Sequence, residues 1–162
     1  MYNKADQIIY SPSDLTLFLE SSFASWMEHF SLNEPKILEL ADEPDELMSV
    51  LQDKGMELEQ RILADFIDRQ LSVVQIERSE HALKDTITAM QSGADVIYQA
   101  ALSIPPFKGY ADFLIKVEGQ SRLGDFQYEI WDTKLSKTVK PHFLVQLCCM
   151  RSAKYTYDPH SK

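Results

Sequence analysis

The sequence predicts an α/β fold in which a mixed central sheet is flanked by helices. Three apolar segments with strand-like alternation follow one another at residues 95–104, 109–119 and 125–135. Segments with helical periodicity lie on either side of this block, near residues 45–71 and 141–150. Helices before and after a block of strands are typical of a layered domain whose helices cover the sheet. The chain has 162 residues, of which 44% are hydrophobic, so it can build one ordinary core.

The predicted elements start with a helix after residues 11–14, Ser-Pro-Ser-Asp. Ser13 or Ser11 is suited to the N-cap, because serine oxygens accept hydrogen bonds from the first free amides of a helix. The helix would continue through LTLFLESSFASWMEHF, with an apolar face made of Leu15, Phe18, Leu19 and Phe23. Residues 31–42 are expected to form a loop.

A long amphipathic helix is predicted over residues 45–71, and Gly55 is the point where it would be interrupted. A short strand is expected at residues 72–79. The next helix, at residues 81–91, would be closed by Gly93. The three strands of the central block then follow in series.

Composition excludes several classes of protein. The N-terminal segment is polar and does not read as a signal peptide, and no apolar run approaches the roughly 20 residues that a membrane span needs. The two cysteines are the neighbours Cys148 and Cys149, which are poorly placed to bridge each other. We therefore expect a reduced, cytoplasmic protein without an iron–sulfur cluster, since two cysteines do not supply the four thiolates of a typical cluster.

The net charge of −9 argues against a nucleic-acid partner, but the charge is unevenly distributed. Residues 1–80 hold 6 Lys and Arg against 17 Asp and Glu, whereas residues 81–162 hold 10 against 8. The basic residues of the second half either form a phosphate-facing surface or are scattered solvated charges. They are Lys108, Lys116, Arg122, Lys137, Lys140, Arg151 and Lys154.

The segment YEIWDTKLSK places an acid and a base two positions apart at the end of an apolar strand. Side chains alternate across a strand, so Asp132 and Lys134 leave the same face. This pattern indicates either an ion pair or a site. Asp112 is a second isolated acid in the preceding strand, and an antiparallel hairpin would bring Asp112 and Asp132 together unless Asp112 faces solvent. Converging carboxylates suit Mg²⁺ or Mn²⁺.

Two glutamates of the long helix have different surroundings. Glu57 precedes Arg61 by one turn on the polar face and is expected to be solvated or in a surface pair. Glu59 is followed at helical spacing by apolar residues, which places it on the buried stripe. A buried acid needs a donor, a water or a metal.

Four elements, in the expected order, carry a resemblance to a known family. They are Glu59 on the helix after Gly55, Asp112 in GYADFL, Asp132-Thr133-Lys134 after an apolar strand, and Gln146 in the last helix. Together they resemble the PD-(D/E)XK nuclease superfamily, above all its RecB-like exonuclease branch, whose pattern is G-x-x-H-E, G-x-x-D, (D/E)-x-K and Q-x-x-x-Y. The likeness covers residues 10–150. It implies a restriction-endonuclease-like fold and a metal-dependent DNA nuclease acting on ends or single strands.

The resemblance also implies a metal site. Asp112, Asp132 and the backbone carbonyl of Thr133 would hold one or two Mg²⁺ or Mn²⁺ ions. Glu59 would contribute directly or through water.

The remaining implied roles concern the substrate. Lys134 would orient the attacking water or stabilise phosphate oxygens. Gln146 would position the lysine or a phosphate, with a surface glutamine as the alternative. Lys137 and Lys140 are expected to contact DNA. The sequence departs from the family pattern at three positions: Leu58 replaces His, Met150 replaces Tyr, and Ser22 lies near the place where relatives with an iron–sulfur cluster have a cysteine. These departures question the efficiency of catalysis more than its chemistry.

The C-terminal part of the chain yields two further expectations. Pro141 suits the first turn of the last helix, and residues 151–162 are predicted to be a polar tail after a domain at residues 1–150. The likeness then stops inside the fold, so we expect self-association, or a partner such as a helicase or another nucleic-acid-processing segment. The alternative function is a catalytically weak or inactive module of the same fold that binds nucleic acid or protein.

Overall fold

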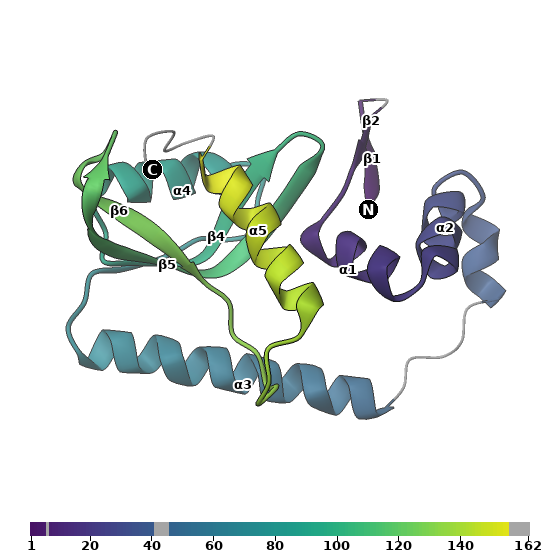
Figure 1. Cartoon of the computed structure of the whole chain (residues 1–162), viewed down its shortest axis with the longest axis horizontal. Coiled ribbons are helices and arrows are strands. Elements are labelled where there is room, and N and C mark those ends of the chain that lie inside the picture. The colour runs from purple at the N-terminus through teal and green to yellow at the C-terminus, as the bar shows by residue number, and fades with distance from the viewer. Residues whose placement is uncertain (6, 41–45, 156–162) are drawn as a thin grey trace.

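The computed structural model describes residues 1–5, 7–40 and 46–155, and it places a four-stranded sheet between helices (Figure 1). The order of the strands is β3-β4-β5-β6. Their bounds are Val73–Gln75, Val96–Ile104, Phe107–Ser121 and Gly124–Trp131. β3 is parallel to β4, whereas the β4–β5 and β5–β6 pairs are antiparallel. The predicted α/β class with a mixed sheet is therefore confirmed.

Helices cover both faces of this sheet. Helix α3 (Glu46–Asp68) packs on one face through Leu63 and Phe66, which contact Val96 and Phe113 of the strands. Helices α4 (Ala82–Ser92) and α5 (Pro141–Tyr155) cover the other face. The hydrophobic core under α4 and α5 includes Met90, Ile97, Leu114, Tyr128 and Met150. Val96 and Phe113 face the core under α3, whereas the next residues, Ile97 and Leu114, face the core under α4 and α5, as alternation in a sheet buried on both faces requires.

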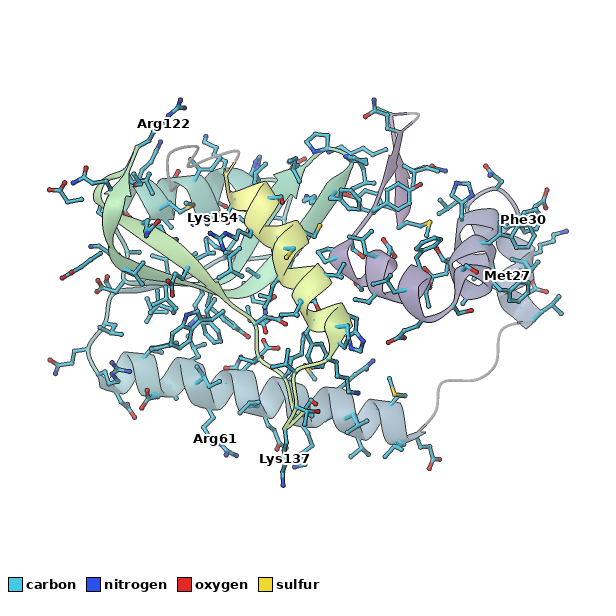
Figure 2. The ribbon with its side chains drawn as sticks, in the orientation of Figure 1. Met27, Phe30, Arg61, Arg122, Lys137 and Lys154 are labelled. Carbon is cyan, nitrogen blue, oxygen red and sulfur yellow. The ribbon has the colours of Figure 1, made fainter. Side chains whose placement is uncertain are left out.

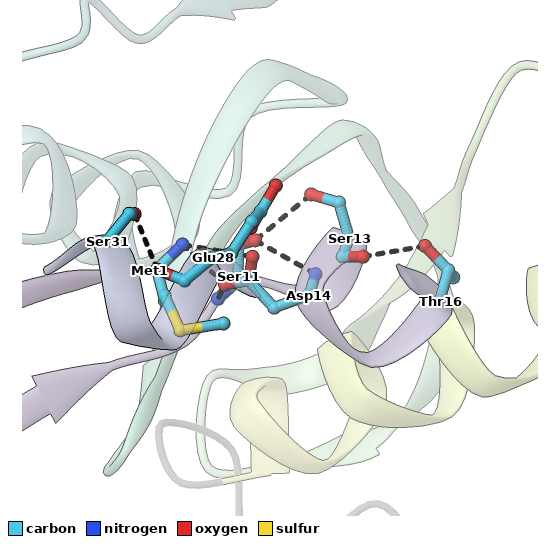
Figure 3. Close-up of polar contacts among 7 residues, drawn as sticks. All are labelled: Met1, Ser11, Ser13, Asp14, Thr16, Glu28 and Ser31. Atoms are coloured by element: carbon cyan, nitrogen blue, oxygen red, sulfur yellow. Dashed lines mark hydrogen bonds and ion pairs between the residues drawn. The ribbon is translucent and has the colours of Figure 1, made fainter. Parts of the chain in front are cut away.

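The N-terminal region folds differently from the predicted single helix. A small hairpin, β1 (Tyr2–Lys4) and β2 (Gln7–Ile9), precedes α1 (Pro12–Glu20), whose N-cap is Ser11. Ser11 and Asp14 form a capping box, and Asp14 also binds the amine of Met1 at 2.9 Å (Figure 3).

The predicted long first helix is broken at Ser21, which caps a second helix, α2 (Ser22–Ser31). The predicted apolar face is therefore divided, because Phe23 lies on α2. It is also largely exposed: the exposed fractions of Phe18, Leu19 and Phe23 are 58%, 56% and 69%. The expected loop also differs: Pro35–Leu40 form a 3-10 helix, η1. Residues 41 and 42 of that loop lie outside the described residues.

The bounds of the other helices and strands differ less from the predicted ones. Helix α3 continues through Gly55 without interruption. Gly93 closes α4 as predicted, with a left-handed φ of 73°. The strand expected at residues 72–79 shortens to β3. Strand β6 ends at Trp131, so Asp132 and Lys134 follow the strand directly.

Helix α5 corrects the predicted polar tail. It begins at Pro141 and extends to Tyr155, and Ala153 and Lys154 are buried in the described part of the chain. The Lys154 ammonium donates a hydrogen bond to the carbonyl of Tyr128. The lysine stem is apolar, so its burial is compatible with packing against the sheet once the ammonium has a partner. The rest of that prediction, residues 156–162, lies outside the described residues.

The cysteines are free thiols. Cys148 is exposed, and Cys149 is half-buried. Burial raises the pKa of the Cys149 thiol. Among the helices that the structure describes, none combines the length and the apolar character needed to cross a membrane.

Buried Thr86 joins α4 to the sheet. Its hydroxyl donates to the carbonyl of Ala82 at 2.9 Å and accepts from the amide of Ala101 in β4 at 2.9 Å. The partner strand β3 ends at Gln75, opposite Tyr98, so the Ala101 amide lies beyond its reach. A helix side chain therefore completes the hydrogen bonding of a central strand.

We predict that Thr86→Val lowers the free energy of unfolding by about 1–3 kcal/mol, because it leaves the buried Ala101 amide without an acceptor. Urea denaturation measures this change. Thr88→Val is the matched control, since Thr88 makes the same bond to the Lys84 carbonyl at 3.0 Å on the exposed side of α4. Equal effects of the two variants would contradict this role of Thr86.

Candidate active site

The strand registers place polar residues in one row across the sheet. Strands β5 and β6 pair Phe113 with Trp131, so the next position puts Asp112 opposite Asp132. The β4–β5 register puts Gln99 opposite Asp112, between the pairs Tyr98–Phe113 and Ala100–Ala111. We call Gln99, Asp112 and Asp132 the polar row. An aromatic row made of Tyr98, Phe113 and Trp131 lies beside it.

The two aspartates of the polar row converge, as the hairpin prediction required. The carboxyl group of Asp112 lies close enough to that of Asp132 to raise the pKa of Asp132. Asp112 Oδ2 accepts from the backbone amide of Thr133 at 2.7 Å and from its hydroxyl at 2.9 Å. Asp132 Oδ2 lies 2.7 Å from Lys134 Nζ, so the ion pair that the sequence suggested is present. The structure brings both predicted features together in one place.

Burial makes the charge on Asp132 unfavourable. Its side chain is only 5% exposed. Desolvation raises the pKa of Asp132, and the neighbouring Asp112 raises it further, although Lys134 acts in the opposite direction. A divalent cation between the two carboxyl groups would remove this repulsion.

Lys134 contacts α5 through a residue that the sequence reasoning missed. Its Nζ lies 5.6 Å from the ring centroid of Phe143, on the face of the ring. The predicted partner Gln146 is half-buried one turn later on α5. Within the described residues, no hydrogen bond joins Gln146 to Lys134. The helix predicted to lie beside the site does so, but an aromatic ring makes the contact.

Glu59 points from α3 toward the polar row, as its place on the apolar stripe predicted. Its Oε2 accepts from the Tyr98 hydroxyl and from Gln99 Nε2, both at 3.1 Å. Desolvation raises the pKa of Glu59, and the charges of Asp112 and Asp132 raise it further. The third acid is therefore electrostatically linked to the other two.

Glu57 lies on the outer side of α3. It pairs with Lys54 at 2.8 Å, and both side chains are 58% exposed. This pair lowers the pKa of Glu57. The expectation of a surface pair is confirmed, with Lys54 as the partner.

Gln99 is a second residue that the sequence reasoning missed. Its φ of +54° lies in the left-handed region, which is uncommon for a residue other than glycine. Its side chain donates to Glu59 and accepts from Arg78 Nη2 at 3.0 Å. Strained positions of this kind cluster at functional sites. The only signal in the sequence is a lone amide within the apolar run VIYQAAL.

The donors of the polar row fit a hard cation only in part. In the described residues, no group of three or more His, Cys, Asp or Glu side chains is arranged so that it could hold a metal ion. Glu59 is turned toward Tyr98 and Gln99 instead. Two converging carboxyl groups nevertheless suit Mg²⁺, which usually keeps several waters and binds through one or two carboxylates.

The predicted basic surface is not continuous. Lys137 and Lys140 lie exposed on the segment between β6 and α5. Lys116 instead donates to the carbonyl of Gly93 at 3.0 Å. Figure 2 shows Arg122 at the upper left, at the tip of the β5–β6 hairpin, and Lys137 at the lower edge of the molecule. The predicted basic residues therefore do not all lie on one surface.

Comparison with models of protein families, with curated proteins and with solved structures finds no match.

We predict that Glu59→Gln raises the thermal midpoint of the metal-free protein, and that the gain grows between about pH 4 and pH 7. The pKa of Glu59 is higher in the folded state than its usual value of 4.5, so the unfolded chain loses this proton first as the pH rises. Ionisation therefore destabilises the native state above that value, and the glutamine removes this cost. Thermal denaturation in EDTA at several pH values measures the difference.

Glu57→Gln is the matched control on the same helix. The folded-state pKa of Glu57 is lowered, so its charge favours the native state at neutral pH, and the substitution should bring no gain. A similar gain from both variants would show that the helix face is assigned wrongly.

Proposed function

We propose that this protein is a metal-dependent DNA nuclease that hydrolyses phosphodiester bonds, with a restriction-endonuclease-like fold and a preference for DNA ends or single strands. The observation that carries the proposal is the convergence of Asp112 and Asp132 beside Lys134 at the end of a β-hairpin. Pairs of acids next to a lysine suit phosphoryl chemistry, because the acids hold a cation and the lysine stabilises phosphate charge.

The acids of the polar row would hold Mg²⁺ or Mn²⁺. Asp112 and Asp132 supply carboxylate oxygens, and the backbone carbonyl of Thr133 would supply a third ligand. The hydrogen bonds from Thr133 to Asp112 fix the orientation of that carboxylate. Glu59 would act through a bound water, since its carboxylate is already held by Tyr98 and Gln99. The bound ion supplies a water of lowered pKa and neutralises phosphate charge.

The other residues would handle the DNA. Lys134 is 32% exposed and its ammonium lies over the Phe143 ring, so it can reach a phosphate oxygen from this position. Lys137 and Lys140 would contact neighbouring phosphates, since both are exposed on the segment that follows Lys134. Gln146 lies on the helix behind Lys134 and would contact a phosphate.

Digestion of labelled single-stranded and double-stranded DNA with Mg²⁺, Mn²⁺ or EDTA tests the proposal. We predict that Lys134→Ala lowers the rate of cleavage by roughly 10²-fold or more, because it removes a charge aimed at the reacting phosphate. Metal binding should persist, since the carboxyl groups remain. Lys36→Ala, on the exposed surface of η1, is the control. Undiminished cleavage by Lys134→Ala would contradict the assignment.

A second prediction concerns the cation. At 100 times the dissociation constant, Mg²⁺ should stabilise the wild-type protein by about 2.7 kcal/mol. Asp132→Asn should lose most of this stabilisation together with cleavage, because the site loses a charged ligand. Thermal denaturation with and without Mg²⁺ measures it, and Asp85→Asn on α4 is the control. Equal Mg²⁺ stabilisation of wild type and Asp132→Asn would place the cation elsewhere.

The alternative is a nuclease-fold module that binds nucleic acid or protein with little or no catalysis. One observation favours it: Glu59 is engaged by Tyr98 and Gln99, and the described residues hold only two converging acids. DNA binding without cleavage in Mg²⁺ and Mn²⁺ would support this alternative.

The expected association with a second copy, or with a helicase or other nucleic-acid-processing segment, stays a prediction. Exposed apolar side chains on α2 and on the first half of α3 support it. They are Phe23, Trp26, Leu47, Met48, Val50 and Leu51.

A further inference from the structure

A cleft of about 770 Å³ opens beside the candidate active site. Arg61 of α3 lines it, as does Arg69, which directly follows the end of this helix. The aromatic residues Phe66 and Trp131 also line it, together with Asp132, Thr133 and Lys134. The cleft therefore joins an aromatic surface, two arginines and the Asp132–Lys134 part of the proposed active site.

Trp131 is the large aromatic surface of this cleft. It is the last residue of β6 and directly precedes Asp132. Its ring centroid lies 6.4 Å from that of Phe66, with the planes tilted by 55°, so Phe66 supports it from the α3 side. The residue is still 49% exposed. The core holds the indole in place while it leaves part of the ring accessible.

The arginines place positive charge along the cleft. Arg61 and Arg69 are eight residues apart, which corresponds to about 12 Å along a helix. Arg69 pairs with Asp65 at 3.5 Å, and both side chains are more than 60% exposed, so this pair is loose. Arg61 projects beyond α3 on the side where Lys137 also projects (Figure 2). Asp65 also lines the cleft, so this side of the cleft carries both signs of charge, with two arginines against one aspartate.

We propose that this cleft binds a segment of single-stranded DNA, with one base stacked on Trp131 and neighbouring phosphates facing Arg61 and Arg69. Stacking on an aromatic side chain requires an accessible base face, which a base inside a duplex does not offer. A strand bound in this way presents its next phosphodiester to Asp132 and Lys134. The position of cleavage rests on the proposed function, whereas the binding of the strand does not.

The sequence holds two tryptophans, Trp26 and Trp131, and this makes a direct test possible. In Trp26→Phe, which keeps an aromatic ring on α2, Trp131 is the only indole. Titration in EDTA with oligothymidine should quench its fluorescence saturably. An abasic phosphodiester strand of the same length and a blunt duplex should bind roughly tenfold more weakly or worse. Equal quenching by the oligothymidine and the abasic strand would overturn the proposal.

Substitutions separate the aromatic from the electrostatic contribution. Measured by anisotropy of labelled oligothymidine in EDTA, Trp131→Ala should weaken binding by roughly tenfold, and Trp131→Phe should retain most of the affinity. Arg61→Ala should weaken binding to all single strands and lower the salt slope by about 1. Lys84→Ala on α4, on the opposite face of the sheet, is the control and should change neither. Wild-type affinity of the Trp131→Ala variant would overturn the proposal, and the fluorescence titration of Trp26→Phe, which keeps Trp131, decides the case if Trp131→Ala folds poorly.

Failure of this inference and failure of the proposed function give different results. Stacking on Trp131 without cleavage in any metal would support the cleft as a single-strand binding site and contradict the nuclease activity. Normal cleavage of single strands by Trp131→Ala, with an unchanged KM, would support the nuclease activity and contradict the role of the cleft.

Discussion

The antiparallel register of β4, β5 and β6 is the constraint on which the site depends. It aligns Gln99, Asp112 and Asp132 in one row and Tyr98, Phe113 and Trp131 in the next. A slip by one residue would exchange the faces of every side chain on a strand. Both faces are buried, with Phe113 in the core under α3 and Leu114 in the core under α4 and α5, so such a slip would bring the acid of β5 into an apolar layer. The packing of the domain therefore also fixes the geometry of its acids.

Much of this arrangement follows from simple patterns. Alternation in the strands and a short hairpin connection were enough to predict that Asp112 meets Asp132. Helical spacing was enough to separate Glu59 from Glu57, because the apolar stripe of α3 marks the side that faces the sheet. The class of the fold followed from the order of helices and strands. These inferences succeeded because each depends on a period of two or of 3.6 residues within one element.

The residues that were missed depend on contacts between elements. Nothing in the run VIYQAAL indicates that Gln99 has a positive φ, because that conformation is held by the neighbouring strand and by Glu59 and Arg78. Phe143 reads as an ordinary apolar residue of α5, although its ring supports Lys134. The last turn of α5 was not predicted, because its residues are mostly polar. A buried lysine such as Lys154 is recognised only once its carbonyl partner on β6 is known.

The way α3 is attached has a consequence for the dynamics of the domain. Only Leu63 and Phe66 of this helix are fully buried, whereas Leu47 and Val50 near its start are 62% and 54% exposed. The sheet and the hairpin that carries both aspartates are held independently by the core under α4 and α5. Local opening free energies follow buried contacts, so α3 forms a unit that can detach while the rest of the sheet stays folded. Such an opening would remove Glu59 and one wall of the cleft together and leave the two aspartates in register.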